Sequence, residues 1–233
     1  MPPIPARILM TLTRWDTPTI CNALEEIVPG RRGHGFTTGA LVPLDPALPP
    51  VCGYARTATI RAAEPPGGSA EDGARKRMAY YDYVAAGPGP TVVVIQDLDP
   101  RPGTGAFWGE VQTNIHKGLG ALGAVTNGSF RDVADSARGF NLIGGRIGPS
   151  HAYVHIVDFG GQVTVEGLTV SSNDIVHADR HGAVMIPAEA VERIAEVADL
   201  LARRERRIIE AARAPGFDTA KLREAIGAAS EIH

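Results

Sequence analysis

An arginine and an aspartate stand side by side at positions 131 and 132, just after a turn that contains Asn127 and Gly128. A guanidinium can grip a carboxylate with two parallel hydrogen bonds, or it can polarise a ketone oxygen. A carboxylate is a hard ligand that suits Mg²⁺, which commonly binds through one or two carboxylates, several waters and the substrate. The pair could therefore hold a small oxo-acid together with a metal ion. The simpler interpretation is that Asp132 caps a short helix over residues 132–138 and that Arg131 is a surface side chain.

A second candidate element is the helix that we expect to begin after Gly109. The free amides of its first turn, from Gly109 through Glu110 and Val111 to Gln112, favour a bound carboxylate or phosphate, as does the helix dipole. Gly109 would let a ligand approach the backbone closely. Glu110 could hold a metal-bound water, or it could simply favour the dipole as an exposed acid in the first turn. The alternative is that Gly109 only shapes a turn between a strand and the helix.

Two histidine pairs, His151 with His155 and His177 with His181, have the i, i+4 spacing of some zinc sites. That spacing converges on a metal only within a helix, and both pairs fall where the pattern predicts strands and turns. An arginine-rich run at residues 203–207 is explained more simply by a solvated or subunit-facing helix surface than by nucleic acid. A phosphate-binding Walker loop, a dinucleotide-binding turn and a nucleophile elbow are missing from the sequence.

Alternating strands and helices predict an α/β domain with a mixed sheet. Thr17 and Pro18 are expected to start the first helix, with the threonine hydroxyl as its cap. Ser69 and Asp72 form a predicted capping box for a helix through about residue 86. The other predicted helices begin after Gly109, at 187 and at 218; the predicted strands cover residues 54–62, 91–95, 124–126, 142–147, 154–159, 162–165, 175–178 and 183–186. In the helix after Gly109, Val111, Ile115 and Leu119 would share one face.

The chain has 233 residues, of which 44% are hydrophobic and 21% are charged, as in ordinary soluble globular proteins. Its net charge of −3 gives no positive field for nucleic acid or an anionic membrane. Its two cysteines, Cys21 and Cys52, lack metal-like spacing and suit a reduced pair. We therefore expect a cytoplasmic protein with a small-molecule substrate and with neither nucleic-acid nor membrane partners.

Several segments together resemble the RraA-like family, which includes 4-hydroxy-4-methyl-2-oxoglutarate aldolases. The similar segments are an opening helix at residues 17–24, a first core strand at 53–58, the Trp-Gly-Glu substrate loop at 108–110, the Gly-rich Arg-Asp signature at 120–132 and a closing segment at 174–187. The resemblance implies a single domain over residues 1–233, built as a swivelling-domain-like β-β-α sandwich with a mixed sheet. Residues 188–233 would form a helical C-terminal extension. It also implies a homotrimer or homohexamer with sites between subunits.

The same resemblance implies roles for the candidate residues. Arg131 would contact the keto-acid and help to stabilise its enolate, and Asp132 would ligate Mg²⁺ or Mn²⁺. Glu110 would hold a metal-bound water, and the amides of residues 109–112 would bind the substrate carboxylate. Glu205 is the match for a glutamate that the neighbouring C-terminal helix supplies in the aldolases.

Two positions depart from the family pattern. Asn127 stands where the signature has an acid, and Asn22 falls where relatives have an acid in the opening helix. Both departures argue against the aldol substrate that is familiar from the family, and neither removes the Arg131–Asp132 pair.

These features favour a divalent-metal-dependent lyase that cleaves a C–C bond of a small 2-oxo acid through a pyruvate-like enolate. Retro-aldol cleavage and oxaloacetate decarboxylation share that enolate. The alternative is a non-catalytic, protein-binding regulator of ribonuclease E, as some relatives are. A third hypothesis is a different enzyme on the same scaffold, with Asn22 and Asn127 marking a new substrate.

Overall fold

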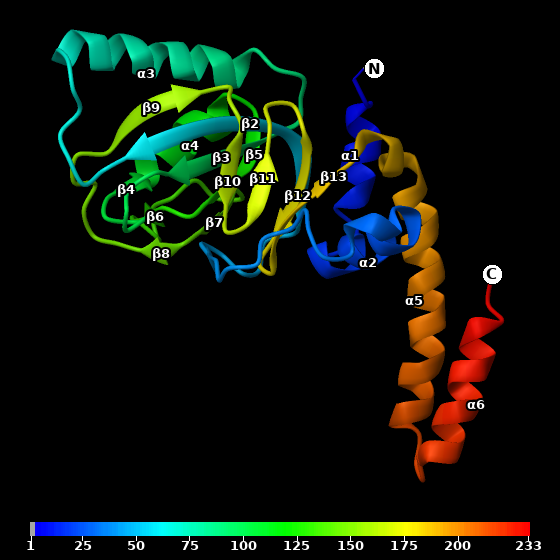
Figure 1. Cartoon of the computed structure of the whole chain (residues 1–233). Coiled ribbons are helices and arrows are strands. Elements are labelled where there is room, and N and C mark those ends of the chain that lie inside the picture. Colours follow the sequence, from blue (N-terminus) through cyan, green and yellow to red (C-terminus); the bar gives the residue numbers. More distant parts are fainter. Residues whose placement is uncertain (1–2) are drawn as a thin grey trace.

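The computed structural model describes residues 3–233, and an eight-stranded mixed sheet forms its centre (Figure 1). The strand order is β1-β7-β5-β3-β2-β12-β13, with β9 also paired to β2. The strands are β1 (Val42–Pro43), β2 (Val51–Arg61), β3 (Thr91–Asp97), β5 (Ala121–Thr126), β7 (Asn141–Gly144), β9 (His155–Phe159), β12 (Ile175–Asp179) and β13 (Gly182–Ile186). Strands β2, β3, β5 and β7 run parallel, whereas the other four pair antiparallel with their neighbours.

The long strand β2 organises this sheet. One edge of β2 pairs with β3, whereas the other edge pairs first with β12, at residues 51–54, and then with β9, at residues 58–61. Two strands thus share one edge of β2, and the sheet curls along its length (Figure 1). Residues 51–58 are all buried, so both faces of this part of the strand are covered, as is typical of a central strand in a mixed α/β domain.

Two small sheets complete the β-structure. Strands β4 (Ala106–Trp108), β6 (Ser129–Phe130) and β8 (Arg146–Ile147) form a parallel three-stranded sheet. Strands β10 (Val163–Val165) and β11 (Leu168–Val170) form a hairpin. The three-stranded sheet matters for function because the candidate residues follow directly after β4 and β6.

The helices fall into two groups. Helices α3 (Ala70–Ala85) and α4 (Glu110–Gly118) belong to the body of the molecule, where α3 packs against β9 (Figure 1). On the other side, α1 (Ala6–Leu12) and α2 (Thr17–Ile27) pack against the first part of α5 (Val191–Arg213), and the short 3-10 turns are η1 (Pro29–Arg31) and η2 (Ala188–Ala190). The rest of α5 projects from the body with α6 (Thr219–Ser230) alongside it (Figure 1).

The fold is therefore a mixed α/β domain with a curled sheet and C-terminal helices, which confirms the predicted fold class. In residues 3–233 we find no helix with both the length and the apolar character needed to cross a membrane.

An aromatic core lies beneath the candidate site. Trp108, Tyr80, Phe130 and Phe140 are fully buried in one hydrophobic cluster, and the ring centroids of Trp108 and Phe140 lie 5.6 Å apart. Truncating such an aromatic side chain to alanine typically costs about 3–5 kcal/mol. Because Trp108 ends β4 and Phe130 ends β6, this packing fixes the two chain segments from which the candidate residues emerge.

Four local predictions were wrong. Asp16, not Thr17, caps α2, since its Oδ1 accepts hydrogen bonds from the amide and the hydroxyl of Thr19. Residues 132–138 form turns rather than a helix. The single strand predicted at residues 142–147 is two strands, β7 and β8, which belong to different sheets. In α4, Thr113 and His116 are buried whereas Val111 is 65% exposed, so the predicted apolar face is not the buried one.

Candidate active site

Two neighbouring strand ends bring the candidate residues together. Strands β4 and β6 are parallel, with Trp108 opposite Phe130, so the chain leaves both at the same edge. The amide of Arg131 donates to the carbonyl of Trp108 across 3.0 Å, which extends this pairing by one residue. Gly109 and Glu110 therefore lie beside Arg131 and Asp132, as the sequence interpretation requires.

Asp132 directly contacts the start of α4. Its Oδ2 accepts a hydrogen bond from the Glu110 amide at 3.2 Å and lies 3.5 Å from Nε of Arg131. The backbone at Asp132 is left-handed, with φ at 53°, a conformation that aspartate tolerates better than most residues. Its carbonyl then accepts from the amides of Asp135 and Ser136, which closes the turn that replaces the predicted helix. Within residues 3–233, Oδ1 makes no hydrogen bond, and the side chain is 33% exposed.

The absence of a side chain at Gly109 makes this contact possible. A Cβ at that position would lie 2.5 Å from Oδ2 of Asp132 and 3.2 Å from Cγ of Arg131. The backbone of Gly109 is extended, with φ at −173°, so its conformation does not itself demand glycine. Glycine is needed here because two functional side chains pack against its Cα.

These groups line one large cavity. The cavity has a volume of about 900 Å³, and its lining includes Gly109, Val111, Gln112, Arg131 and Asp132. The first-turn amides of Val111 and Gln112 have no carbonyl to bond within their own helix. A carboxylate in this cavity could therefore bind an arginine and the positive end of a helix, and a partly exposed aspartate lies beside them.

Two of the proposed site residues, Glu110 and Glu205, do not line the cavity. The side chain of Glu110 is exposed, and Glu110 does not line the cavity, although its amide bonds Asp132. Glu205 is an exposed residue on α5, which projects from the far side of the body, and it also does not line the cavity (Figure 1). Any contact between Glu205 and this site would need a second copy of the chain.

A buried histidine of α4, His116, joins this helix to Tyr80 of α3. Sequence reasoning missed this contact. His116 is fully buried, with Nδ1 2.7 Å from the Gln112 carbonyl and Nε2 2.8 Å from the Tyr80 hydroxyl. Because a carbonyl only accepts, Nδ1 carries the proton, and Nε2 accepts from Tyr80. Burial lowers the pKa of His116 to about 4, so the ring is neutral at pH 7. The Tyr81 hydroxyl also donates to Oε1 of Gln112 at 3.1 Å, which orients that side chain at the cavity wall.

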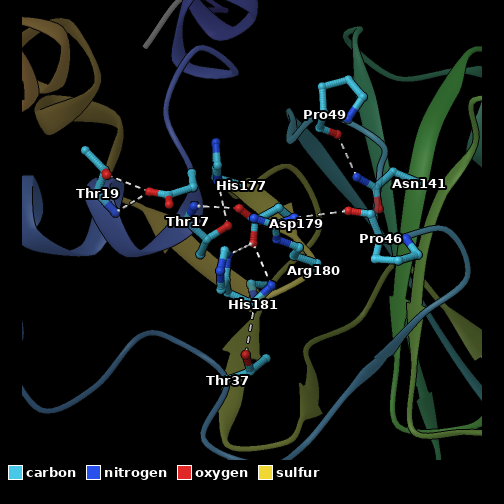
Figure 2. A network of polar contacts seen from close by, with 12 residues as sticks. Thr17, Thr19, Thr37, Pro46, Pro49, Asn141, His177, Asp179, Arg180 and His181 are labelled. Atoms are coloured by element: carbon cyan, nitrogen blue, oxygen red, sulfur yellow. Dashed lines mark hydrogen bonds and ion pairs between the residues drawn. The ribbon is translucent and has the colours of Figure 1, made fainter.

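Neither histidine pair lies on a helix: His151 is in a loop, His155 and His177 are in strands, and His181 is in a turn. His177 and His181 belong to a polar cluster that joins the start of α2 to β12 and the turn after it (Figure 2). Nδ1 of His177 lies 3.0 Å from the Thr17 hydroxyl, and Nδ1 of His181 lies 3.1 Å from Oδ1 of Asp179. Oδ2 of Asp179 accepts from the Thr17 amide at 2.9 Å, which clamps the helix to the sheet. Across residues 3–233, no three His, Cys, Asp or Glu side chains gather as a ready-made metal site.

The sequence of residues 17–185 matches the RraA-like family, described as Aldolase/RraA. This chain belongs to the RraA-like family. The matched residues include both the Arg131–Asp132 pair and the start of α4, so the family resemblance expected from the sequence is confirmed.

Solved structures share the RraA-like fold. An uncharacterized protein from Pseudomonas syringae pv. tomato aligns with a TM-score of 0.71 at 19% identity, over 97% of this chain and 99% of its own. Streptomyces coelicolor RraAS2, described as an unusual member of the RNase ES inhibitor RraA family, aligns with a TM-score of 0.67 at 23% identity, over 85% and 93% of the two chains. A structure of the RNA-processing inhibitor RraA from Thermus aligns with a TM-score of 0.52 at 14% identity, over 72% and 92%. No curated protein matches the chain in sequence.

The structure gives Asn127, one of the two departures from the RraA-like pattern, a local role. Its Oδ1 accepts from the Asp97 amide at 2.7 Å, and its Nδ2 donates to the Asp97 carbonyl at 3.1 Å. Only an amide side chain can make both bonds, because a carboxylate has no donor. Asn127 thus ties the end of β5 to the end of β3 and does not line the cavity. Asn22, the other departure, is exposed on α2.

Proposed function

We propose that this RraA-like protein is a divalent-metal-dependent lyase that cleaves a C–C bond of a small 2-oxo acid. The observation that carries the proposal is that Arg131, Asp132 and the first turn of α4 open into the same cavity. An anion-binding helix end beside an arginine and a free carboxylate oxygen suits a substrate whose carboxylate and ketone must both be held.

Asp132 suits Mg²⁺ or Mn²⁺ better than zinc. Its Oδ1, on a side chain that is 33% exposed, offers one hard oxygen ligand, and no group of three or more His, Cys, Asp or Glu side chains accompanies it in residues 3–233. Mg²⁺ commonly keeps several waters and binds through one or two carboxylates and the substrate, whereas zinc takes four compact ligands. When bound there, the metal would supply Lewis-acid polarisation of the substrate oxygens.

The side chains and amides of this chain would share the remaining work. The amides of Val111 and Gln112 would bind the C1 carboxylate, and Arg131 would face the C2 oxygen. In retro-aldol cleavage the C4 hydroxyl gives its proton to solvent and C4 leaves as the ketone of a second 2-oxo acid, whereas in oxaloacetate decarboxylation C4 leaves as CO2. In both cases the electrons of the broken C3–C4 bond pass into the C2–C3 bond, and those of the C2 carbonyl move onto its oxygen. Arg131 would stabilise that enolate oxygen before C3 takes a proton to give pyruvate. Retro-aldol cleavage and decarboxylation of oxaloacetate would both use this step.

Glu205 and the oligomer belong to the same proposal. Because α5 projects from the body, a second copy could place its Glu205 at this cavity in a trimer or hexamer. Glu110, whose backbone amide bonds Asp132, would hold a metal-bound water with its side chain. The expected cytoplasmic location remains a prediction.

Pyruvate release tests the proposal. The purified protein would be assayed with 4-hydroxy-4-methyl-2-oxoglutarate and with oxaloacetate, in Mg²⁺, in Mn²⁺ and in EDTA. We expect pyruvate from at least one substrate, its loss in EDTA, and a decrease in kcat/KM of at least about 100-fold in Arg131→Ala and Asp132→Asn, the range found when one transition-state donor is removed. Arg138→Ala is the matched control, because Arg138 is a nearby exposed arginine outside the cavity. Full activity in either site variant would exclude the mechanism.

A protein-binding role is the second candidate function, because the Aldolase/RraA family is named for both activities. A pull-down with a ribonuclease E would separate the two roles. A regulator would bind that enzyme equally well in wild type and in Asp132→Asn, with no pyruvate formed by either protein.

A further inference from the structure

A second cavity lies where the start of α2 meets the turn between β12 and β13. Its volume is about 460 Å³, within the range of about 300–1,000 Å³ that small-molecule pockets occupy. Three segments contribute to its lining: residues 14–19 around the start of α2, the loop residues 46–50, and residues 179–181 at the turn. It shares no lining residue with the cavity at Arg131, so the proposed function makes no use of it.

Two arginines of the second cavity have no carboxylate partner within residues 3–233. The guanidinium of Arg14 lies 5.1 Å from the centroid of the Trp15 ring, a cation–π contact that leaves its N–H donors free. The guanidinium of Arg180 makes one long hydrogen bond, of 3.5 Å, to the carbonyl of Pro46 (Figure 2). A guanidinium carries several donors and can bind two oxygens of a carboxylate or a phosphate at once. Both arginines therefore have donors available for an anionic ligand.

The buried carboxylate of this cavity, Asp179, is already occupied. Its Oδ2 accepts from the amide of Thr17 at 2.9 Å, and its Oδ1 accepts from the amide of His181 at 2.8 Å and lies 3.1 Å from Nδ1 of that ring (Figure 2). Because a carboxylate only accepts, Nδ1 of His181 carries the proton, and Nε2 of the neutral ring is an acceptor. Nε2 makes no hydrogen bond within residues 3–233, and the residue is exposed. Asp179 thus orients His181 and leaves it with a free acceptor at the cavity.

Asp16 supplies a second free acceptor. As the cap of α2, it accepts the amide and the hydroxyl of Thr19 on Oδ1, whereas Oδ2 makes no hydrogen bond within residues 3–233. Burial raises the pKa of Asp16, but the hydrogen bonds from Thr19 and the nearby His181 and His177 bring that pKa below its ordinary value. The carboxylate is therefore ionised at neutral pH, and it lies near His181.

The donors and acceptors together restrict the kind of ligand. A simple anion would use the two arginines alone and would be repelled by Asp16. A phosphate, with several terminal oxygens, can accept from guanidinium groups on different segments, whereas a carboxylate presents a single pair of oxygens. Hydroxyl groups elsewhere in the ligand would donate to Oδ2 of Asp16 and to Nε2 of His181.

We propose that the second cavity binds a small hydroxylated phosphate monoester, of the class of sugar and polyol phosphates. Arg14 and Arg180 hold the phosphate, and Asp16 and His181 accept from the hydroxyl groups. The site is separate from the proposed lyase site, and the inference does not rest on the proposed function.

Calorimetric binding of three matched probes tests the second cavity. Glycerol 3-phosphate and propyl phosphate share a three-carbon chain and a phosphate and differ only in the hydroxyl groups, and glycerol lacks the phosphate. We expect wild type to bind glycerol 3-phosphate at least about 10-fold more tightly than propyl phosphate, as hydrogen bonds to both acceptors would give, and to show no measurable binding of glycerol.

Four substitutions of exposed residues separate the phosphate contacts from the hydroxyl contacts. Arg14→Gln and Arg180→Gln should each lower the affinity for both phosphates at least about 10-fold, the contribution of one hydrogen bond to a charged group. Asp16→Asn, which keeps a capping side chain, and His181→Phe should each lower the affinity for glycerol 3-phosphate at least about threefold without lowering that for propyl phosphate.

Arg32→Gln is the matched control, because Arg32 is an exposed arginine that pairs with Glu25 and does not line the second cavity. Arg32→Gln and Arg131→Ala should both bind glycerol 3-phosphate as wild type does. The proposal would be overturned by absence of binding in wild type, by unchanged affinity in Arg14→Gln and Arg180→Gln, by loss of binding in Arg131→Ala, or by equal wild-type affinities for the two phosphates. Because the measurement needs no turnover, a failure to release pyruvate would leave its result unaffected.

Discussion

The backbone amide of Glu110 donates a hydrogen bond to Oδ2 of Asp132, and this contact joins the end of β4 to the turn after β6. It uses one oxygen of the carboxylate, and Oδ1 makes no hydrogen bond within residues 3–233. It also places the guanidinium of Arg131 beside the first turn of α4. The proposed activity depends on this geometry, so changes that alter the contact without unfolding the chain are the most informative.

Gly109→Ala should lower activity while leaving the fold intact. The added methyl would lie 2.5 Å from Oδ2 of Asp132, so the carboxylate must move. Displacements of about 1 Å at a reacting centre can reduce rates about 100-fold, and we expect a decrease of at least about 10-fold in kcat/KM. Gly118→Ala, at the other end of the same helix, is the control, because its Cβ would meet no atom within 4 Å. Wild-type kinetics in Gly109→Ala would show that the position of Asp132 is unimportant.

Asn127→Asp should destabilise the protein, although it restores the acid expected in the family. The substitution removes the donor to the Asp97 carbonyl and places a carboxylate beside that carbonyl oxygen. We expect a loss of about 1–2 kcal/mol in the free energy of unfolding, measured by urea denaturation. Asn22→Asp, at the exposed departure on α2, should change it by less than about 0.5 kcal/mol. Equal effects of the two substitutions would argue against the bridging role of Asn127.

Stability should fall as the pH drops from about 6.5 towards 4. Burial lowers the pKa values of His116 and His177 to about 4 in the folded chain, whereas an exposed histidine titrates near 6.5. Because the unfolded chain binds these protons first, the stability is fully present above pH 6.5 and is lost as the pH falls through this window. Each histidine should contribute about 2 kcal/mol to the difference between pH 7.5 and pH 5.

Urea unfolding at the two pH values measures this difference. His116→Gln should reduce the pH dependence by the contribution of one histidine, and His34→Gln, which changes an exposed residue, should leave it as in wild type. A pH dependence in His116→Gln as large as that of wild type would contradict the neutral, buried state of His116.

Local signals in the sequence predicted much of the fold and of the site. The capping box of Ser69 and Asp72 marked the start of α3, Asp218 capped the last helix, and the β-branched run at 91–95 lies in β3. The closeness of Arg131, Asp132 and Gly109 was implied by the family resemblance, whereas the paired strands β4 and β6 that produce it were not predicted.

What the sequence could not predict depends on tertiary contacts. The turn after Asp132 is set by its left-handed backbone and by the α4 amide that it accepts, and neither is a local property of residues 132–138. Val111 lines the cavity and is exposed rather than buried in the core. The apolar character of its side chain therefore led to a wrong prediction of the buried face of α4. The bond between His116 and Tyr80 joins residues 36 positions apart, and no spacing rule identifies such a pair.

The most direct test of the account is a crystal structure with Mg²⁺ and oxalate, a planar dianion that resembles the enolate of pyruvate. We expect the metal on Oδ1 of Asp132 and the oxalate between the metal, the guanidinium of Arg131 and the amides of Val111 and Gln112. Oxalate bound only elsewhere, or a cavity in which neither oxalate nor Mg²⁺ contacts Arg131 and Asp132 at saturating concentrations, would contradict the account.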